Sequence, residues 1–406
     1  MPALAVQAAG AASIVAWAAL LVLSAPLAVT FAALAVRHPV AGGVSAYVRA
    51  GLGDTAAAVT GWWFVAAMLL GGPTVALIGG YYVADLTGSG TGVAAVVGAL
   101  IFATVLAANA LGLRFSSGFQ LGLSSVLIVV VGLAIVVALP SRAGDNWTPF
   151  APHGWWAVGT AANILIWLFV GWEAVAQLAG DFRRPQVDLP RAIALSFGVV
   201  AVLYVGLAVA TIGVTNGSES RVPLADLVSV GFGDVGRDAT AFLAVALTMG
   251  TMNVYMGGSA KLIAALAARG ELPRWLGAGA VRSIPLRPLA LMAVSGAALL
   301  AGLVAGIGST SDLVRATSAL FIAVYVLAVV SGVRILSGRA RAAASSALVF
   351  VLALAIFSAG FLVVPAVVAA GAIGLLRAVR PKCVGFGPST ATSPHALPMK
   401  SPPRPG

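Results

Sequence analysis

The chain has 406 residues, of which 60% are hydrophobic and only 9% are charged, and its mean hydropathy is +1.04. A water-soluble domain of this size would need far more charge to cover its surface, so the composition excludes that class and predicts a polytopic protein embedded in a lipid bilayer. The net charge of +11 would suit a nucleic-acid partner, but its distribution along the chain fits membrane topology instead, and no nucleic acid is expected. The single cysteine excludes an internal disulfide framework, and the three histidines lie in predicted loops or the tail, so neither a metal site nor a cofactor is expected.

Apolar runs of about 20 residues recur along the chain, and each matches the roughly 30 Å hydrocarbon thickness of a bilayer. The strict alternation typical of barrel strands is absent, so the runs are predicted to be helices. The final apolar block, 344–379, is too long for one helix, and Gly360 and Pro365 near its middle predict a hairpin of two short spans. Residues 381–406 are rich in Pro, Ser and Gly and are predicted to be a disordered tail. After a short apolar fragment at 1–10, the other predicted spans are 11–36, 59–85, 92–113, 119–140, 155–180, 190–213, 238–265, 286–307 and 311–335.

Basic residues are distributed unevenly between the connections on the two sides of the predicted membrane. Of the 23 lysines and arginines, all except Arg142, Arg221, Arg237 and Arg315 fall in alternate connections or at the C-terminus. Lysine and arginine accumulate in cytoplasmic loops. The connections that hold them are therefore predicted to be cytoplasmic, and so is the C-terminus.

The span predicted at 155–180 is unusual because its apolar residues surround Gly171 and Glu173. A charged side chain near the bilayer centre costs about 2.5–3.5 kcal/mol on insertion scales, so it usually faces protein or water and marks a pathway. Gly171 is the predicted point at which the helix unwinds and leaves backbone groups free for a substrate. Glu173 has two open interpretations: a carboxylate that binds a proton or a substrate amine, or a brace for the free backbone amides.

Three motifs give the chain a resemblance to a known family. The first is P-x-x-G-G-x-x-A-Y-V-R-x-x-x-G at residues 39–53, followed by G-W-W at 61–63. The second runs from Trp167 through Phe169, Gly171 and Glu173 to D-F-R-R-P at 181–185 and D-L-P-R-A at 188–192, and the third joins G-S-A-K at 258–261 to A-R-G-E-L-P-R-W at 268–275. The motifs occur in order and each lies on its predicted side of the membrane. Residues 11–340 therefore resemble the amino acid–polyamine–organocation superfamily of permeases, nearest to bacterial neutral amino acid transporters of the leucine and methionine type, although Asp181 stands where glutamate is common.

The resemblance implies an all-helical transporter fold of two inverted five-helix repeats with two further helices at the end. Residues 11–140 would then hold helices 2–5 of the first repeat, residues 155–335 would hold helices 6–10, and residues 344–379 would form the C-terminal hairpin. Residues 1–10 would be a remnant of helix 1, because Met1-Pro2-Ala-Leu resembles the residues just after the glycine-rich break whose backbone amides hold the substrate carboxylate. We expect either a start codon upstream of Met1 or a permease that lacks this half-helix.

The resemblance also implies a substrate site around the broken helix. Trp167 matches an aromatic residue that closes over the bound substrate in related antiporters, while Asn253 has an interhelical hydrogen bond as its alternative role. Methionine, leucine and glycine around the site, with no second intramembrane acid, favour an apolar amino acid. Asp181, Arg184 and Arg191 are candidate inner-gate residues, with a solvated basic loop as the alternative. The candidate substrate-binding residues are Gly72, Trp167, Phe169, Val170, Gly171, Glu173, Met252 and Asn253.

Together, these features predict secondary active transport of amino acids by alternating access, most of all of neutral and apolar amino acids, across the bacterial inner (plasma) membrane. Glu173 is the candidate for proton coupling, and sodium coupling and substrate exchange stay open. The alternative functions are a transport-inactive amino acid sensor of the same fold and a truncated, non-functional permease. An enzyme is not expected, because the spans lack the His/Asp pairs or metal clusters of an intramembrane active site.

Overall fold

The computed structural model describes residues 1–37, 43–113, 117–141, 144–172, 182, 184–215, 220–277 and 285–379, and this part of the chain is helical with no strand. The α-helices are α1 (Pro2–Ala9), α2 (Ser13–Arg37), α3 (Gly43–Leu52), α4 (Asp54–Leu86), α5 (Thr91–Ala110), α6 (Ser117–Ala138), α7 (Trp156–Leu165), α9 (Pro185–Thr215), α10 (Pro223–Ala268), α11 (Leu286–Val304), α12 (Thr310–Ile335), α13 (Gly338–Phe357) and α14 (Val363–Val379). Short 3₁₀ turns are η1 (Gly10–Ala12), η2 (Leu139–Ser141), η3 (Gly144–Trp147), η4 (Ile166–Phe169), η6 (Arg274–Leu276) and η7 (Ala359–Phe361).

The helical fold follows from the apolar character of the chain. Inside hydrocarbon every backbone N–H and C=O must be bonded internally, and a helix achieves this within a single segment. Within the described residues, ten helical segments are long and apolar enough to cross a membrane, and the shorter apolar segment Trp156–Phe169 lies where a broken span was expected. The predicted fold class, an all-α protein with many apolar helices long enough to span a membrane, is confirmed for the described residues.

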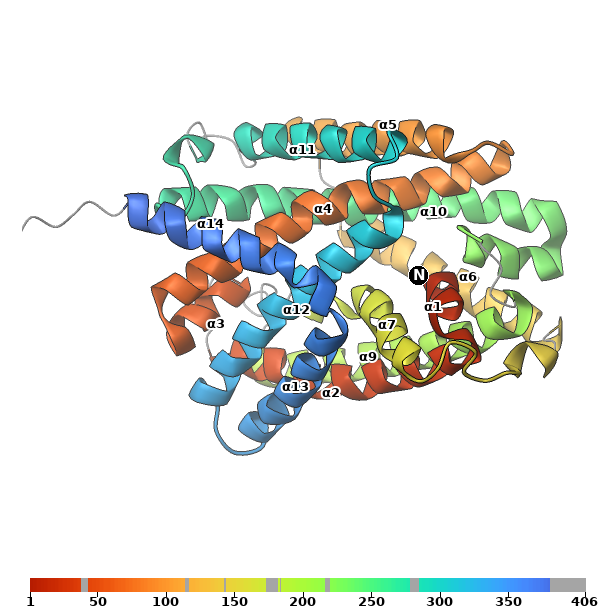
Figure 1. Ribbon diagram of the computed structural model, residues 1–406, viewed down its shortest axis with the longest axis horizontal. Helices are drawn as coiled ribbons and strands as arrows, with labels where there is room; N and C mark the ends of the chain where they lie inside the picture. Colours follow the sequence, from red (N-terminus) through yellow and green to blue (C-terminus); the bar gives the residue numbers. More distant parts are fainter. Residues whose placement is uncertain are drawn as a thin grey trace, which may run out of the picture.

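Most of the long helices run roughly along the long axis of the molecule and pack in two groups (Figure 1). One buried cluster joins α4, α5, α10 and α11 through residues such as Phe102, Met256 and Met292. A second and larger cluster joins α1, α2, α3, α7, α9, α12 and α13 around Trp17, Phe31 and Tyr325. The two groups meet where α4 lies against α12, and a small cluster there joins Met68 to Leu320 and Phe321.

Two helices depart from simple spans. Helix α10 bends sharply at Gly233, whose backbone (φ 58°, ψ −148°) is not helical, so the part before it forms a separate arm ahead of the predicted span at 238–265. Helix α4 contains Pro73 within its length. Proline in a helix interior removes one hydrogen bond and crowds the preceding turn.

The C-terminal block forms two helices, α13 and α14, and its turn contains Gly360 while Pro365 lies in the first turn of α14. Helix α13 begins at Gly338, earlier than the predicted boundary at 344. This hairpin packs closely on α7: the side-chain amide of Asn163 donates to the Ser358 hydroxyl, and a Cβ at Gly159 would overlap the ring of Phe357. The Trp63 indole of α4 donates to the Pro365 carbonyl at 2.7 Å, so the hairpin contacts both helix groups.

Candidate functional site

The broken helix begins as α7 and loses its α-helical backbone after Leu165. A 3₁₀ turn, η4, covers Ile166–Phe169, Val170 is extended (φ −72°, ψ 136°), and Gly171 has a φ of 137°. Residues with a side chain rarely adopt this φ, so the glycine permits the unwinding. The Tyr204 hydroxyl of α9 donates to the Leu168 carbonyl at 2.7 Å and satisfies one of the freed acceptors. The predicted break at Gly171 is confirmed.

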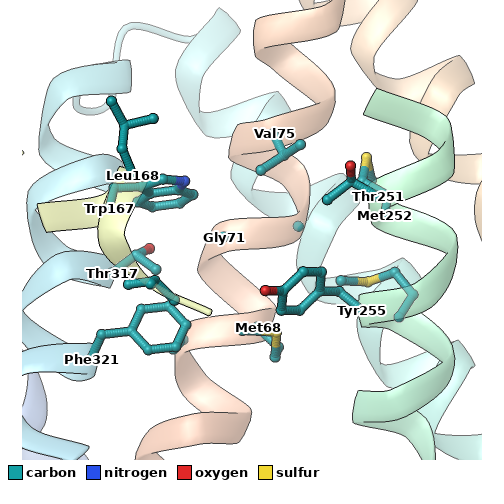
Figure 2. Close-up of a pocket in the computed structure, with 14 residues that line it drawn as sticks. Met68, Gly71, Val75, Trp167, Leu168, Thr251, Met252, Tyr255, Thr317 and Phe321 are labelled. Carbon is teal, nitrogen blue, oxygen red and sulfur yellow. The ribbon is translucent and has the colours of Figure 1, made fainter. Parts of the chain in front are cut away.

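A cavity of about 270 Å³ lies beside this break, where α4, η4, α10 and α12 face one another (Figure 2). The cavity therefore occupies the boundary between the two helix groups, next to the Met68–Phe321 contact. Ligand sites in proteins range from about 300 to 1,000 Å³, so this volume suits a small molecule. The lining residues are Ala67, Met68, Gly71, Gly72, Val75, Trp167, Leu168, Val170, Thr251, Met252, Tyr255, Met256, Thr317 and Phe321.

The chemistry of the cavity is apolar with a few hydroxyl groups. Three thioethers, from Met68, Met252 and Met256, line it together with aromatic rings and aliphatic side chains. Its hydroxyl groups are those of Thr251, Tyr255 and Thr317, and none of the described lining residues is charged. Because a buried charge without a partner is very costly, such a wall favours a ligand whose side chain is neutral.

The structure brings four of the sequence-predicted residues together at this cavity: Gly72, Trp167, Val170 and Met252. Figure 2 shows the Trp167 indole facing the cavity beside α4, and a Cβ at Gly71 would lie 3.4 Å from that indole ring. Glycine at position 71 therefore gives the ring room to approach α4. Gly72 is also a packing position, since a Cβ there would lie 2.9 Å from the Met256 Cε and 3.1 Å from the Phe102 ring.

Other predicted site residues lie elsewhere. Phe169 faces α9 and α2, where its ring packs on Tyr204 and Trp17, and with Gly171 it lines a second cavity of about 330 Å³ beside α9. Asn253 faces α5: its side-chain amide donates to the Leu113 carbonyl just after α5 at 3.5 Å, and its backbone carbonyl accepts from the Asn109 amide at 3.3 Å. Glu173 lies outside the described residues.

Sequence reasoning did not single out Val75, Tyr255, Met256, Thr317 or Phe321, all of which line the cavity. A signal was present in the helical spacing. Residues three or four positions apart share a helix face, and this relation links Thr251 to Tyr255, Met252 to Met256 and Thr317 to Phe321. Such a spacing shows which residues share a face, but it does not tell a cavity-facing stripe from a packed one.

The candidate inner-gate residues are only partly described. Arg184 lies 3.8 Å from Asp188 with 74% of its side chain exposed, Arg191 is exposed, and Asp181 lies outside the described residues. A more buried ion-pair network lies at the C-terminal end of α3. There Arg49 pairs with Glu271 at 2.6 Å and with Asp54 at 2.5 Å, and the hydrogen bond to Glu271 raises the pKa of the guanidinium.

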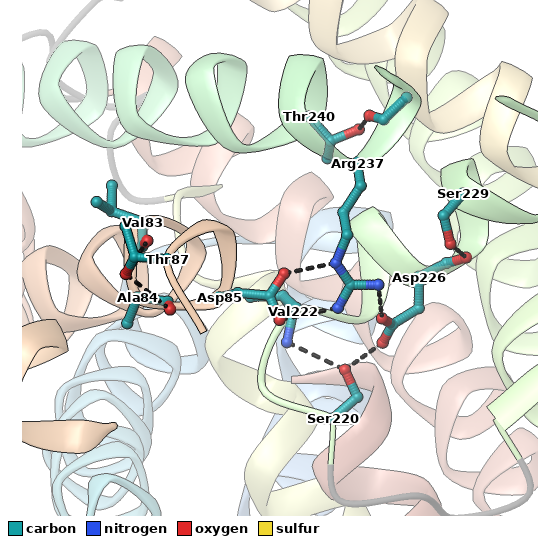
Figure 3. A network of polar contacts seen from close by, with 11 residues as sticks. Val83, Ala84, Asp85, Thr87, Ser220, Val222, Asp226, Ser229, Arg237 and Thr240 are labelled. Atoms are coloured by element: carbon teal, nitrogen blue, oxygen red, sulfur yellow. Dashed lines mark hydrogen bonds and ion pairs between the residues drawn. The ribbon is translucent and has the colours of Figure 1, made fainter. Parts of the chain in front are cut away.

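A second polar network joins α4 to α10. Arg237 of α10 donates to both carboxylate oxygens of Asp85, at the end of α4, with distances of 2.7 and 2.8 Å, and lies 3.2 Å from Asp226 (Figure 3). At the other end, the Trp62 indole of α4 donates to the Glu271 carbonyl at 2.8 Å, just after α10. Helices α4 and α10 are thus joined by polar contacts near both ends, which favours their moving as one body.

Comparison with known proteins agrees with this architecture. A family model described as amino acid permease matches residues 2–376. The uncharacterized amino acid permease YecA of Bacillus subtilis is 32% identical over 343 residues, covering 84% of this chain and 81% of that relative. The L-methionine/branched-chain amino acid exporter YjeH of Escherichia coli is 29% identical and covers 84% of this chain and 82% of its own length. The branched-chain amino acid permease BcaP of Bacillus subtilis is 30% identical over 205 residues, or 46% of this chain and 44% of its own.

These matches confirm the resemblance drawn from the three sequence motifs, and they indicate a transporter rather than an enzyme. The family match over residues 2–376, the apolar helices and the broken helix beside the cavity all lead to one assignment. The chain belongs to the amino acid permease family.

Proposed function

We propose that this permease is a secondary active transporter that moves neutral, apolar amino acids across the plasma membrane by alternating access. The observation that carries the proposal is the position of the uncharged, methionine-lined cavity, which lies on the boundary between two helix groups and beside a broken helix. A ligand held there contacts both groups. Movement of one group against the other would then expose the ligand to either side in turn.

The packing supports two bodies that move against each other. Helices α4, α5, α10 and α11 share one buried core. An ion pair joins α4 to α10 near one end, and the hydrogen bond from the Trp62 indole to the Glu271 carbonyl joins α4 to the segment just after α10 near the other end. Helices α1, α2, α7 and α9 share the other. Hinge and shear motions of this kind move packed elements as units, because close-packed cores are bistable rather than continuously deformable.

The lining supports an apolar substrate. Burying a leucine- or methionine-sized side chain in an apolar site contributes about 1.5–3 kcal/mol, whereas a cationic or anionic side chain would meet no charged partner on the described walls. The names of two relatives point the same way, since one is an exporter of methionine and branched-chain amino acids and the other a branched-chain permease. The backbone of η4, which departs from the α-helix, lies beside the cavity and is suited to meet the zwitterionic end of the substrate.

Reconstitution of the purified protein in proteoliposomes tests the proposal. Labelled leucine and methionine are expected to accumulate, while lysine and glutamate do not. Three driving forces are supplied in parallel (a proton gradient, a sodium gradient and internal unlabelled leucine), so that an unsuitable ion does not mask transport. Liposomes without protein give the background.

A thermal-shift titration of the same protein with leucine separates the alternatives. Flux under any driving force supports a transporter. Leucine binding without flux of any amino acid would favour the sensor, and loss of both would contradict the assignment of the cavity as an amino acid site.

A further inference from the structure

Many of the described serine and threonine hydroxyls on the spanning helices donate a hydrogen bond to a backbone carbonyl of their own helix. Thr30, Thr60 and Thr74 each donate to the carbonyl four residues earlier, at 2.7 to 2.8 Å. Thr104 and Thr240 do the same. This local bond is the usual solution for serine and threonine in a helix, because a hydroxyl left without a partner in an apolar interior is costly.

Thr317 of α12 departs from this pattern. Its side chain is fully buried (0% exposed), and its hydroxyl has no hydrogen-bond partner among the described residues. The residue lines the central cavity, and its methyl group lies 3.4 Å from the position of a Cβ on Gly71. Figure 2 places Thr317 close to the Trp167 indole on one wall of the cavity. A buried polar group in this setting is expected to have a partner, and the cavity offers space for one.

The wall formed by α10 is mixed: the thioethers of Met252 and Met256 and the hydroxyls of Thr251 and Tyr255 line the cavity there. Figure 2 shows Met252 on α10, across the cavity from Thr317. An apolar amino acid has one polar end, which carries the carboxylate and the ammonium group, and one apolar end, which is its side chain. The Thr317 hydroxyl, which is buried and has no partner among the described residues, is therefore suited to bind the polar end.

We propose that Thr317 is a substrate-binding residue whose hydroxyl hydrogen-bonds the zwitterionic head group of the amino acid, while the substrate side chain packs among the thioethers of the cavity. This inference rests on the proposed transport function. A threonine hydroxyl both donates and accepts, so it serves either the carboxylate or the ammonium group. Because this hydroxyl has no partner among the described residues, a bond to the substrate replaces no internal bond there.

The neighbouring Ser318 provides a matched control. It is equally buried (0% exposed), and its hydroxyl also lacks a hydrogen-bond partner in the described structure, but it does not line the cavity. A general cost of unsatisfied hydroxyls in α12 would affect both positions alike. A substrate contact affects Thr317 alone.

The test compares Thr317→Val, Thr317→Ser and Ser318→Ala in proteoliposomes, together with their apparent melting temperatures. Valine keeps the shape of threonine and removes the hydroxyl. We expect Thr317→Val to raise the KM for leucine by about 10- to 100-fold, the range for a lost hydrogen bond to a charged group, with a melting temperature equal to or above that of the unmodified protein. Thr317→Ser is expected to stay within a few-fold of the unmodified KM, and Ser318→Ala to leave it unchanged.

The outcomes separate this inference from the proposed function. No flux from the unmodified protein would contradict transport itself. Normal flux from the unmodified protein with an unchanged KM in Thr317→Val would overturn the role of Thr317 alone. A parallel loss in Thr317→Val and Ser318→Ala, or a fall in melting temperature that accounts for the lost uptake, would also overturn it. If Thr317→Val does not reach the membrane, Thr317→Ala against Thr317→Ser makes the same comparison.

Discussion

Among the predicted site residues, substitution of Met252 tests most directly whether the cavity holds the substrate side chain. Its side chain is 2% exposed and lines the cavity on the α10 side. Met252→Ala removes the Cγ, Sδ and Cε atoms and enlarges the space for the substrate side chain. In an apolar pocket one methylene is worth about 1–3 kcal/mol, or roughly 10- to 200-fold in specificity. We therefore expect the KM for leucine to rise at least about ten-fold, and that for phenylalanine to change less, as measured by competition for uptake.

The matched control for this change is Val254→Ala on the same helix. Val254 is 58% exposed and does not line the cavity, so its truncation should alter neither KM. An unchanged order of preference in Met252→Ala, or the same change in both variants, would argue that the substrate side chain is held elsewhere.

Single residues also show how far the sequence predicts the site. Gly171 could be identified because a glycine beside a carboxylate in the middle of an apolar span favours unwinding of the helix, and its φ of 137° is the physical reason. Thr317 and Tyr255 could not, because in a bilayer both the lipid face and the core face of a helix are apolar, so the pattern does not indicate which face meets the cavity. Asn253 shows the opposite difficulty: an amide in a span binds a neighbouring segment as readily as a ligand, and its side chain donates to the Leu113 carbonyl.

At the scale of elements, the close contact of α7 with the C-terminal hairpin gives a prediction about stability. A Cβ at Gly159 would overlap the Phe357 ring, which also packs against Trp156 at a centroid distance of 4.7 Å. Gly159→Val should therefore destabilise the protein by about 1–3 kcal/mol, the usual cost of overpacking. The measurement is the apparent melting temperature in detergent, followed by size-exclusion chromatography.

A second substitution identifies the cause. Adding Phe357→Ala to Gly159→Val should recover part of the lost melting temperature, because the two residues are in contact and their effects are coupled. Gly198→Ala on α9, where a Cβ would meet nothing within 4 Å, is the control and should be neutral or slightly stabilising. Additive losses from the two exchanges would mean that the hairpin does not rest on α7.

Element boundaries were predictable to differing degrees. Spans such as α5 and α12 lie close to the predicted limits because glycine and polar turns flank uniform apolar runs. The bend of α10 at Gly233 was not predicted. Its sequence context, Gly231-Phe-Gly233-Asp, does not show that helix is present on both sides of the bend. Helix α3 begins at Gly43, and the ion pair that places it, between Arg49 and Glu271, joins residues far apart in the sequence and could not be predicted from it.

For the whole molecule, the uneven distribution of basic residues predicts the orientation, and the helix order lets the prediction be tested at several points. With the C-terminus in the cytoplasm, the connection between α12 and α13 lies on the same side, and the turn between α4 and α5 lies outside. The single cysteine, Cys383, is a natural probe for the C-terminal segment. We expect a membrane-impermeant maleimide to label it only after the cells are permeabilised.

Two further positions complete the test in a Cys383→Ser background. Ser337→Cys, in the exposed link between α12 and α13, should behave like Cys383, while Ser89→Cys, in the turn between α4 and α5, should react in intact cells. Both exchanges are nearly isosteric, so the fold should not change. Because each helix between the probes reverses the side, a reversed pattern at all three positions would mean that the whole protein is inverted. Labelling of Ser89→Cys and Ser337→Cys from the same side would show instead that one of the intervening helices does not cross the membrane.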